Sequence, residues 1–399
     1  MGEAISYIVN PRSRKMESAK APTDMFSPEK ARAVREFHRR LPFYEPTPLV
    51  QLAQRADELG VSKVCVKDES HRFGLNAFKV LGATFGVAHA LAKRLELVET
   101  EISFDTLRSS EIRSELSTLT LVTATDGNHG RAVAWVAQKL GCRSVVYLPE
   151  GTARARYESI RAHGADAFLI SGNYDKAVRI AADQAERNGW LLIQDSAWEG
   201  YEEVPSKIMQ GYLTILDEAL EQLGSELPTH ILVQCGVGSL AASLQAFLVE
   251  KYGLERPQFI VVEPKGAACF FESVTAGDDE PRTIEGELNT IMAGLACGTP
   301  STLAWNILRD YADAFVECSD QVTIEGMRAL GNPLEGDKGV ISGESGAVTM
   351  GLCKFVLKEP GCREARRDLK LDADSKILLI STEGDTDPDR YAEILRGGP

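Results

Sequence analysis

The sequence predicts an α/β fold in which mostly parallel sheets are covered by helices on both faces. From Leu119 onward, short continuous apolar runs alternate with amphipathic helical patterns. The runs are LTLVTAT, RSVVYLP, DAFLI and WLLIQ, and helical patterns such as AVAWVAQKLG follow them. Apolar strands that alternate with helices are typical of βαβ units, whose sheet is buried on both faces. Four further runs continue the alternation to the C-terminus: THILVQC, FIVVE, AFVEC and SKILLIS.

The chain before Leu119 predicts a simpler series of elements. Residues 1–25 are expected to form a polar arm. A helix should follow, because residues 27–29 supply an N-cap serine, a proline at the first helical position and an acid in the first turn. The proline-rich residues 45–52 predict an extended segment, and residues 52–60 predict a helix that ends at its glycine. The strand KVCVK comes next.

Two later segments depart from the short-strand pattern. Residues 203–224, EVPSKIMQGYLTILDEALEQLG, predict one long helix. Residues 277–301 have no apolar period and are rich in glycine, proline and charge, so we expect an irregular, exposed loop there.

Composition and charge exclude several classes of protein. With 399 residues, of which 44% are apolar, the chain can fill two or three domains of about 150 residues each. Its net charge of −14 argues against nucleic acid and anionic membrane surfaces as partners, because both need a basic patch. No apolar run reaches the ~18 residues of a membrane helix, and the N-terminus has no signal-peptide core. A cytoplasmic location is therefore expected.

The eight cysteines are scattered, without a CxxC pair or a histidine at zinc-ligand spacing. They indicate small buried hydrophobic residues, and no metal site is expected. The spacing leaves a bridge between Cys269 and Cys297 open without favouring it.

Lys79 is the central candidate for chemistry. It lies in KDESHRFGLNAFKVLG, residues 67–82, where a strand-like run gives way to a helical pattern, and its neighbours on both sides are apolar or small. Desolvation lowers the pKa of a lysine, and a neutral amine can form a Schiff base with a carbonyl cofactor or act as a base. The alternative is a lysine at a helix start whose stem covers apolar surface while its amine reaches solvent.

A glycine turn between an apolar strand and a helix is a candidate phosphate site. In QCGVGSLAASLQAFL, backbone N–H groups at a helix N-terminus are supplied by Gly236, Val237, Gly238 and Ser239. The alternative is a tight turn that serves packing alone. The pattern is neither GxGxxG nor a triphosphate-binding loop, which disfavours both nucleotide interpretations.

Two other turns of the same kind carry acids. LVTATDGNHGRAVAW places Asp126 and Asn128 between a strand and a helix, and QDSAWEGYEEVP places Asp195 after a strand. Open parallel sheets bind ligands at these ends of their strands. An aspartate in such a turn is equally typical of a helix cap. The runs SGESGAV (residues 342–348) and STEGDTD (residues 381–387) have the same alternative.

Together these landmarks resemble the fold type II pyridoxal-phosphate enzymes, the tryptophan synthase beta-like family. The fuller strings RFGLNAFK, TATDGNHGRAVAW, QDSAWEGYEEVPSKIMQGY and STEGDTD resemble the diaminopropionate ammonia-lyase family in particular. The resemblance runs from EPTPL to the C-terminus. It implies two doubly wound domains with mostly parallel sheets and pyridoxal 5'-phosphate as cofactor.

The resemblance also implies roles for single residues. Lys79 would hold the cofactor as a Schiff base, and Asn128 would contact the ring hydroxyl. Residues 236–239 would cradle the phosphate. Either Ser381 or Thr382 would hydrogen-bond the pyridine nitrogen, and the spacing does not choose between them.

Asp126 separates this chain from serine and threonine dehydratases, whose turn resembles S-GNH with a hydroxyl at this place. A carboxylate repels a substrate carboxylate, attracts a second ammonium and accepts a proton. Asp195 would add a second carboxylate where the two turns meet at one sheet edge. We therefore expect α,β-elimination of 2,3-diaminopropionate to pyruvate and two ammonia. Lys79 would take the α proton of the L isomer and Asp126, aided by Asp195, that of the D isomer.

Further expectations follow from the same resemblance. Glu344 and Ser345 are candidates to face the small amino-acid substrate, with helix-start chemistry as the alternative. A homodimer is implied, with a large cofactor-binding domain of residues 1–72 and 201–399 and a small mobile domain of residues 73–200. Two other functions stay open: a dehydratase-type elimination of serine or threonine, and a non-catalytic cofactor-binding homologue.

Overall fold

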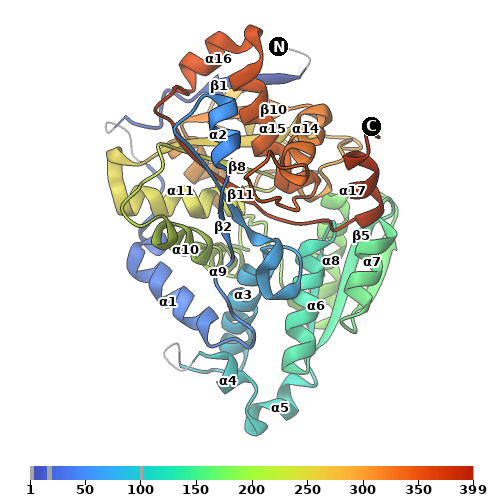
Figure 1. Cartoon of the computed structure of the whole chain (residues 1–399). Helices are drawn as coiled ribbons and strands as arrows, with labels where there is room; N and C mark the ends of the chain where they lie inside the picture. Colours follow the sequence, from blue (N-terminus) through green and yellow to red (C-terminus); the bar gives the residue numbers. More distant parts are fainter. Residues whose placement is uncertain (1–3, 16–19, 99–101, 399) are drawn as a thin grey trace.

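The computed structural model describes residues 4–15, 20–98 and 102–398, and the strands described there form two sheets (Figure 1). The strands are β1 (Ile5–Val9), β2 (Leu49–Gln51), β3 (Lys63–Asp68), β4 (Thr120–Ala124), β5 (Arg143–Pro149), β6 (Asp166–Ile170), β7 (Leu191–Leu192), β8 (His230–Gln234), β9 (Gln258–Pro264), β10 (Ala314–Cys318) and β11 (Lys376–Ser381). The helices are α1 (Pro28–Arg39), α2 (Ala53–Leu59), α3 (Lys79–Arg94), α4 (Phe104–Leu107), α5 (Ser110–Leu116), α6 (Asn128–Leu140), α7 (Arg154–Arg161), α8 (Tyr174–Asn188), α9 (Glu203–Gly211), α10 (Leu213–Leu223), α11 (Ser239–Tyr252), α12 (Cys269–Ala276), α13 (Thr302–Tyr311), α14 (Asp320–Gly331), α15 (Glu344–Lys358), α16 (Arg363–Asp368) and α17 (Pro388–Leu395).

The larger sheet has seven strands in the order β1-β10-β9-β8-β11-β3-β2. Its strands from β10 to β3 run parallel, and β1 and β2 pair antiparallel at the two edges. The predicted polar arm over residues 1–25 is therefore wrong at β1. The sequence ISYIV is rich in β-branched residues, and Ile5 is buried, so this strand extends the sheet edge.

The smaller sheet has four parallel strands in the order β6-β5-β4-β7. Its strands lie between residues 120 and 192, inside the small domain expected over residues 73–200. The domain boundaries themselves stay a prediction. In Figure 1 this sheet and helices α6 to α8 are green and lie to one side of the larger sheet.

Helix α3 joins the two parts because it packs against both α9 and α6. The contact with α9 is close: a Cβ atom at Gly82 would lie 2.5 Å from the ring of Tyr212, and one at Gly211 would lie 2.5 Å from the carbonyl oxygen of Leu81. Buried apolar side chains of α3, α6 and α9 belong to one core, which fixes the helix that begins at Lys79.

Most expected elements are confirmed. Helix α1 begins after Ser27, whose hydroxyl accepts a hydrogen bond from the N–H of Lys30, and α2 ends at Gly60 with φ +74°. The single helix expected over residues 203–224 is instead two helices, α9 and α10, on either side of Tyr212. Across the part of the chain that the structure describes, none of the helices has the length and apolarity needed to span a membrane.

The expectation of an exposed loop over residues 277–301 is only half right. The segment is irregular, and its first half is exposed. Its second half turns inward, where Leu288, Met292, Leu295 and Cys297 are buried. These apolar residues are too widely spaced to show a helix or strand period, which is why the sequence pattern does not reveal their burial.

Candidate active site

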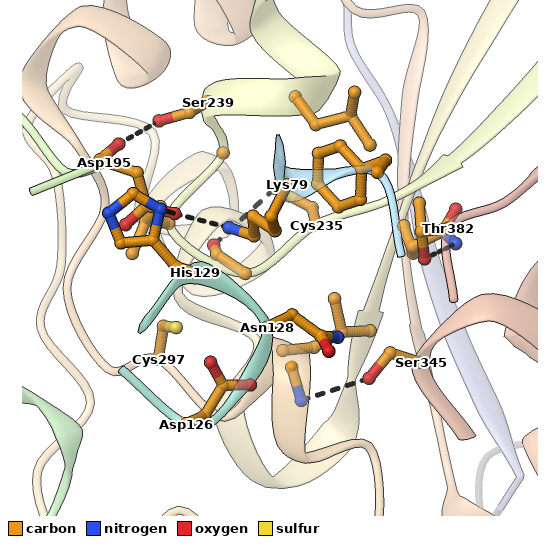
Figure 2. A pocket seen from close by; sticks show the side chains of 18 of the residues that line it. Lys79, Asp126, Asn128, His129, Asp195, Cys235, Ser239, Cys297, Ser345 and Thr382 are labelled. Carbon is orange, nitrogen blue, oxygen red and sulfur yellow. Dashed lines mark hydrogen bonds and ion pairs between the residues drawn. The ribbon is translucent and has the colours of Figure 1, made fainter. Parts of the chain in front are cut away.

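The carboxyl ends of strands from both sheets meet at one pocket (Figure 2). The start of α3, the β4–α6 turn, Asp195 in the segment after β7, the β8–α11 turn and the residues after β11 all contribute to its lining. Of the residues that the sequence singled out, the lining includes Lys79, Asp126, Asn128, Asp195, Gly236, Val237, Gly238, Ser239, Ser345 and Thr382. Turns that are far apart in the sequence are thus neighbours in space, as expected for the ends of parallel strands.

Lys79 is the first residue of α3, and its amine lies inside the pocket (Figure 2). The N–H of Phe78 donates to the carbonyl of Thr382 at 3.1 Å, which ties the helix start to the end of β11. The amine forms an ion pair with Oδ2 of Asp195. Burial lowers the pKa of Lys79, but Asp195, with smaller contributions from Tyr212 and Asp126, outweighs burial, and the net pKa lies above its ordinary value. The predicted lowering of this pKa is therefore wrong for this structure.

Asp195 follows β7, and its side chain is 2% exposed. Its Oδ1 accepts hydrogen bonds from the hydroxyl of Tyr174 at 3.3 Å and from Nε2 of Gln194 at 3.4 Å. Burial raises the pKa of Asp195, but the Lys79 ammonium, His129 and the hydrogen bond from Tyr174 hold it below its ordinary range. Asp195 is thus an ionised carboxylate directed at Lys79.

The β8–α11 turn presents its backbone to the pocket. Gly238 has φ +94°, which favours glycine, and a Cβ atom there would collide with the ring of Phe270 and lie 2.8 Å from Cβ of Ala304. A Cβ atom at Gly236 would lie 3.2 Å from a backbone carbonyl oxygen. Ser239 begins α11, a helix of 14 residues whose first N–H groups have no partner within the helix. The two glycines therefore leave a backbone cradle at a helix N-terminus, which fits a phosphate dianion.

Asp126 lies in the β4–α6 turn, at the boundary between this pocket and a larger outer cavity of about 980 Å³. Helix α6 begins at Asn128 without a side-chain cap, so the alternative role of Asp126 as a helix cap is wrong. Among the described side chains, the hydroxyl of Thr125 is the one that donates a hydrogen bond to Asp126, at 3.5 Å. Burial raises the pKa of Asp126, and the more distant charges of Lys79 and Arg156 oppose this.

The comparisons with known proteins agree with this geometry. Residues 41–383 match the family model for pyridoxal-phosphate dependent enzymes. The chain is 45% identical to diaminopropionate ammonia-lyase of Salmonella typhimurium, covering 100% of this chain and 99% of that one. It is 44% identical to the Escherichia coli enzyme of the same name over 94% of this chain and 93% of that one. The chain belongs to the diaminopropionate ammonia-lyase family of pyridoxal-phosphate dependent enzymes.

Solved structures of this family have the same fold. The crystal structure of Escherichia coli diaminopropionate ammonia lyase with an aminoacrylate-PLP azomethine reaction intermediate matches with a TM-score of 0.88, at 42% identity and over 98% of this chain and 96% of that chain. A threonine deaminase of Solanum lycopersicum, 20% identical over 98% of this chain and 96% of that chain, matches with a TM-score of 0.70 and shares the fold type. The predicted α/β, fold type II architecture is thus confirmed.

The pocket fits the cofactor of the family, pyridoxal 5'-phosphate. An amine lies inside it at Lys79, and the backbone cradle at residues 236–239 suits the phosphate. The hydroxyl of Thr382 accepts a hydrogen bond from Gln234 at 2.7 Å, which leaves its own hydrogen available to the pocket. Asn128 donates to Glu383 and accepts from Arg131 at 3.1 Å, so its side chain is held in one orientation.

Two of the candidate residues, Ser381 and Glu344, do not line this pocket. The hydroxyl of Ser381 donates to the hydroxyl of Ser342 at 2.8 Å. Glu344 lines the outer cavity instead, 3.6 Å from Arg156. Burial raises the pKa of Glu344 to about 7, and the nearby Glu383 adds to this while Arg156 opposes it.

The pocket also contains residues that the sequence did not single out. Tyr174 begins α8 just after the SGN turn that follows β6, so it has the same strand–turn–helix setting as the other candidates, although the sequence did not single it out. Gly294 and Cys297 come from the irregular segment that was expected to be exposed. All eight cysteines are free thiols, so the open possibility of a bridge between Cys269 and Cys297 is not realised here. Glu383 follows Ser381 and Thr382 in STEGDTD, and its carboxylate accepts a hydrogen bond from the N–H of Ser345 at 3.1 Å.

Proposed function

We propose that this chain catalyses the α,β-elimination of D- and L-2,3-diaminopropionate to pyruvate and two molecules of ammonia. The observation that carries the proposal is the carboxylate of Asp126, which stands in the pocket where the dehydratase-like turn has a hydroxyl. Identity of 45% to a diaminopropionate ammonia-lyase over the whole chain supports it. Pyridoxal phosphate, when bound, supplies the electron sink for the pair released at the α carbon.

The lining residues have separate roles in holding the cofactor. Lys79 would be the covalent attachment point, and residues 236–239 would hold the phosphate. Asn128 would contact the ring hydroxyl. Thr382 rather than Ser381 would face the pyridine nitrogen, because Thr382 lines the pocket while the hydroxyl of Ser381 donates to Ser342.

Two bases at different places in the pocket account for turnover of both isomers. Lys79 takes the α proton of the L isomer, and Asp126 takes that of the D isomer. Figure 2 shows the two side chains on different sides of the pocket. Asp195 acts through Lys79, because its charge makes the amine a stronger base. Ser345 faces the substrate from the start of α15, and Glu344 meets it only at the mouth of the pocket.

Asp126→Asn tests the proposal directly. The variant keeps the shape of the side chain and removes the base, so turnover of the D isomer should fall by about 10²-fold or more while that of the L isomer changes much less. Pyruvate release from each isomer and from serine measures the outcome. If the variant turned over both isomers as fast as wild type does, Asp126 would have no part in the mechanism. If wild-type protein preferred serine to both isomers, the function would be that of a dehydratase.

A visible spectrum tests the cofactor assignment independently. Wild-type protein should be yellow, lose its colour on reduction with borohydride and carry the reduced cofactor on Lys79. Protein reduced at a different lysine would contradict the assignment.

The proposal extends to the location, assembly and domain movement of the chain. The chain acts as a cytoplasmic homodimer, as the family resemblance implies, and residues 73–200 move toward the rest of the chain to exclude water from the pocket. Light scattering of the purified protein checks the dimer. X-ray scattering with and without substrate checks the movement.

A further inference from the structure

Glu383 is a buried carboxylate that connects three segments of the pocket. It lies just after β11, is 1% exposed and lines the pocket. Its Oε1 accepts a hydrogen bond from the N–H of Ser345 at 3.1 Å. Its Oε2 accepts hydrogen bonds from Nδ2 of Asn128 and, at 3.4 Å, from the hydroxyl of Thr386. One oxygen of Glu383 therefore meets the start of α15, and the other meets the start of α6.

Two partners of opposite chemistry fix the side-chain amide of Asn128. The carboxylate of Glu383 accepts hydrogen bonds, whereas the guanidinium of Arg131 only donates them. Nη2 of Arg131 donates to Oδ1 of Asn128 at 3.1 Å, so the carbonyl of Asn128 faces Arg131 and its nitrogen faces Glu383. That nitrogen carries two hydrogens, and the hydrogen bonds among the described residues leave one of them free. Asn128 lines the pocket, where this hydrogen is available to a bound molecule (Figure 2).

We propose that Glu383 is a positioning residue that turns the amide of Asn128 so that an N–H, and not the carbonyl, meets the ring oxygen of the cofactor. This inference rests on the function proposed above, in which Asn128 contacts that oxygen. An N–H donor stabilises the oxygen as an anion, whereas a carbonyl would repel the anion. The bound cofactor is yellow when the O–H bond of the ring has broken and its proton is on the nitrogen of Lys79. It absorbs in the near ultraviolet when the oxygen keeps the proton.

The charges around Glu383 suit a carboxylate that serves as an acceptor. The charged groups that face it come from four elements: Arg131 of α6, Arg156 of α7, Glu344 of α15 and Asp126 of the β4–α6 turn. Burial lowers the pKa of Arg131 to about 10, with Arg156 adding to this and Glu383 opposing it, so Arg131 is a cation at neutral pH. The two guanidinium groups offset the charge of the buried carboxylate.

The opposing interpretation is that Glu383 only fastens three segments to one another, and Glu383→Gln separates the two. The N–H of Ser345 selects the carbonyl of the glutamine, so the new amide nitrogen faces Nδ2 of Asn128, where two donors meet. Asn128 then loses its fixed orientation. In the holoenzyme the ratio of visible to near-ultraviolet absorbance should fall about fivefold, because a hydrogen bond to an ionised group is stronger than one to a neutral group. The matched control is Thr386→Val, which removes a donor to the same oxygen without touching Asn128 and should leave the ratio unchanged.

Asn128→Ala tests whether Glu383 acts through Asn128. This variant should lower the absorbance ratio by itself, and Glu383→Gln should cause no further change in its background. An unchanged ratio in Glu383→Gln, or an equal fall with and without Asn128, would overturn the proposal. If Asn128→Ala leaves the ratio unchanged, the contact assigned to Asn128 fails and the role of Glu383 fails with it. Pyruvate release by wild-type protein judges the proposed function separately from these spectra.

A second measurement does not depend on the stability of the variants. A crystal structure of the wild-type holoenzyme should show one terminal atom of the Asn128 side chain between Glu383 and the ring oxygen, with the other terminal atom still on Arg131. An Asn128 that has separated from Glu383, or that turns the atom bonded to Arg131 toward the ring, would contradict the proposal.

Discussion

The ion pair between Lys79 and Asp195 should be a large, measurable source of stability in protein stripped of its cofactor. Asp195 is 2% exposed and Lys79 17%, so both charges are largely withdrawn from water. Removing one partner of a buried pair leaves an uncompensated charge, which costs about 3–5 kcal/mol. Lys79→Met should lie at the upper end of this range, because it strands the more deeply buried Asp195. Asp195→Asn should lie at the lower end.

A double-mutant cycle isolates the pair itself. The double variant should be destabilised by less than the sum of the single variants, with a coupling of about 2 kcal/mol. The matched control is the ion pair between Lys93 and Glu203, which also has its lysine on α3 but pairs it with α9 and is 71% and 61% exposed. Its coupling should be below about 0.5 kcal/mol. Urea unfolding at pH 7 measures both cycles, and equal couplings for the two pairs would refute the reasoning.

The pH dependence of the coupling follows from the two pKa shifts. Asp195 has a pKa below its ordinary 3.8 in the folded chain, so its contribution is present above about pH 4 and is lost as pH falls below that value. Lys79 has a pKa above its ordinary 10.5, so its contribution is present below about pH 10 and is lost as pH rises further. The coupling should therefore be constant across neutral pH and decline at both extremes.

Three further predictions concern the pocket and the outer cavity beside it. Gly238→Ala should cost about 2–4 kcal/mol of stability and lower cofactor affinity, because the residue has a positive φ and its Cβ atom would collide with the core. Gly236→Ala lacks the positive φ and should cost less. Unfolding curves measure the stability of both variants, and cofactor absorbance measures their affinity. Thr382→Val should weaken cofactor retention in dialysis far more than Ser381→Ala does, and equal losses would contradict the assignment of Thr382. The unfolding free energy of cofactor-stripped protein should fall as pH rises from 4.5 to about 7, because the pKa of Glu344 is higher in the folded chain than in the unfolded chain. In Glu344→Gln, the contribution of Glu344 to this pH dependence should vanish.

The convergence of the candidate residues could be predicted because of a property of parallel sheets. Asp126, Asp195 and the turn at residues 236–239 each follow an apolar strand, and ligands bind at the carboxyl ends of such strands. The sequence could not assign those strands to sheets. β4 and β7 belong to the smaller sheet and β8 to the larger one, so the pocket forms between the two sheets.

Features that depend on distant partners could not be predicted from local patterns. The apolar neighbours of Lys79 indicate a lowered pKa, but the sign is set by Asp195, which is 116 residues further along the chain. Tyr174 follows β6 at a strand–turn–helix boundary, but a tyrosine there is not by itself a catalytic residue type, and its role is visible only once its hydroxyl is seen to donate to Asp195. Cys297 likewise reaches the pocket only through the path of an irregular segment.

The two acids of the pocket differ in environment, and this difference supports their separate roles. Asp195 has a cation and two donors, and its pKa lies below the ordinary value. Asp126 accepts a long hydrogen bond from the hydroxyl of Thr125 and pairs with no cation among the described side chains, and burial raises its pKa. A carboxylate with a raised pKa is the better proton acceptor, and one with a lowered pKa is the better permanent charge. Asp126 therefore suits direct proton removal from the substrate, and Asp195 suits action through Lys79. The expectation that Asp195 assists Asp126 on the D isomer is less consistent with these contacts than a role for Asp195 with Lys79 on the L isomer.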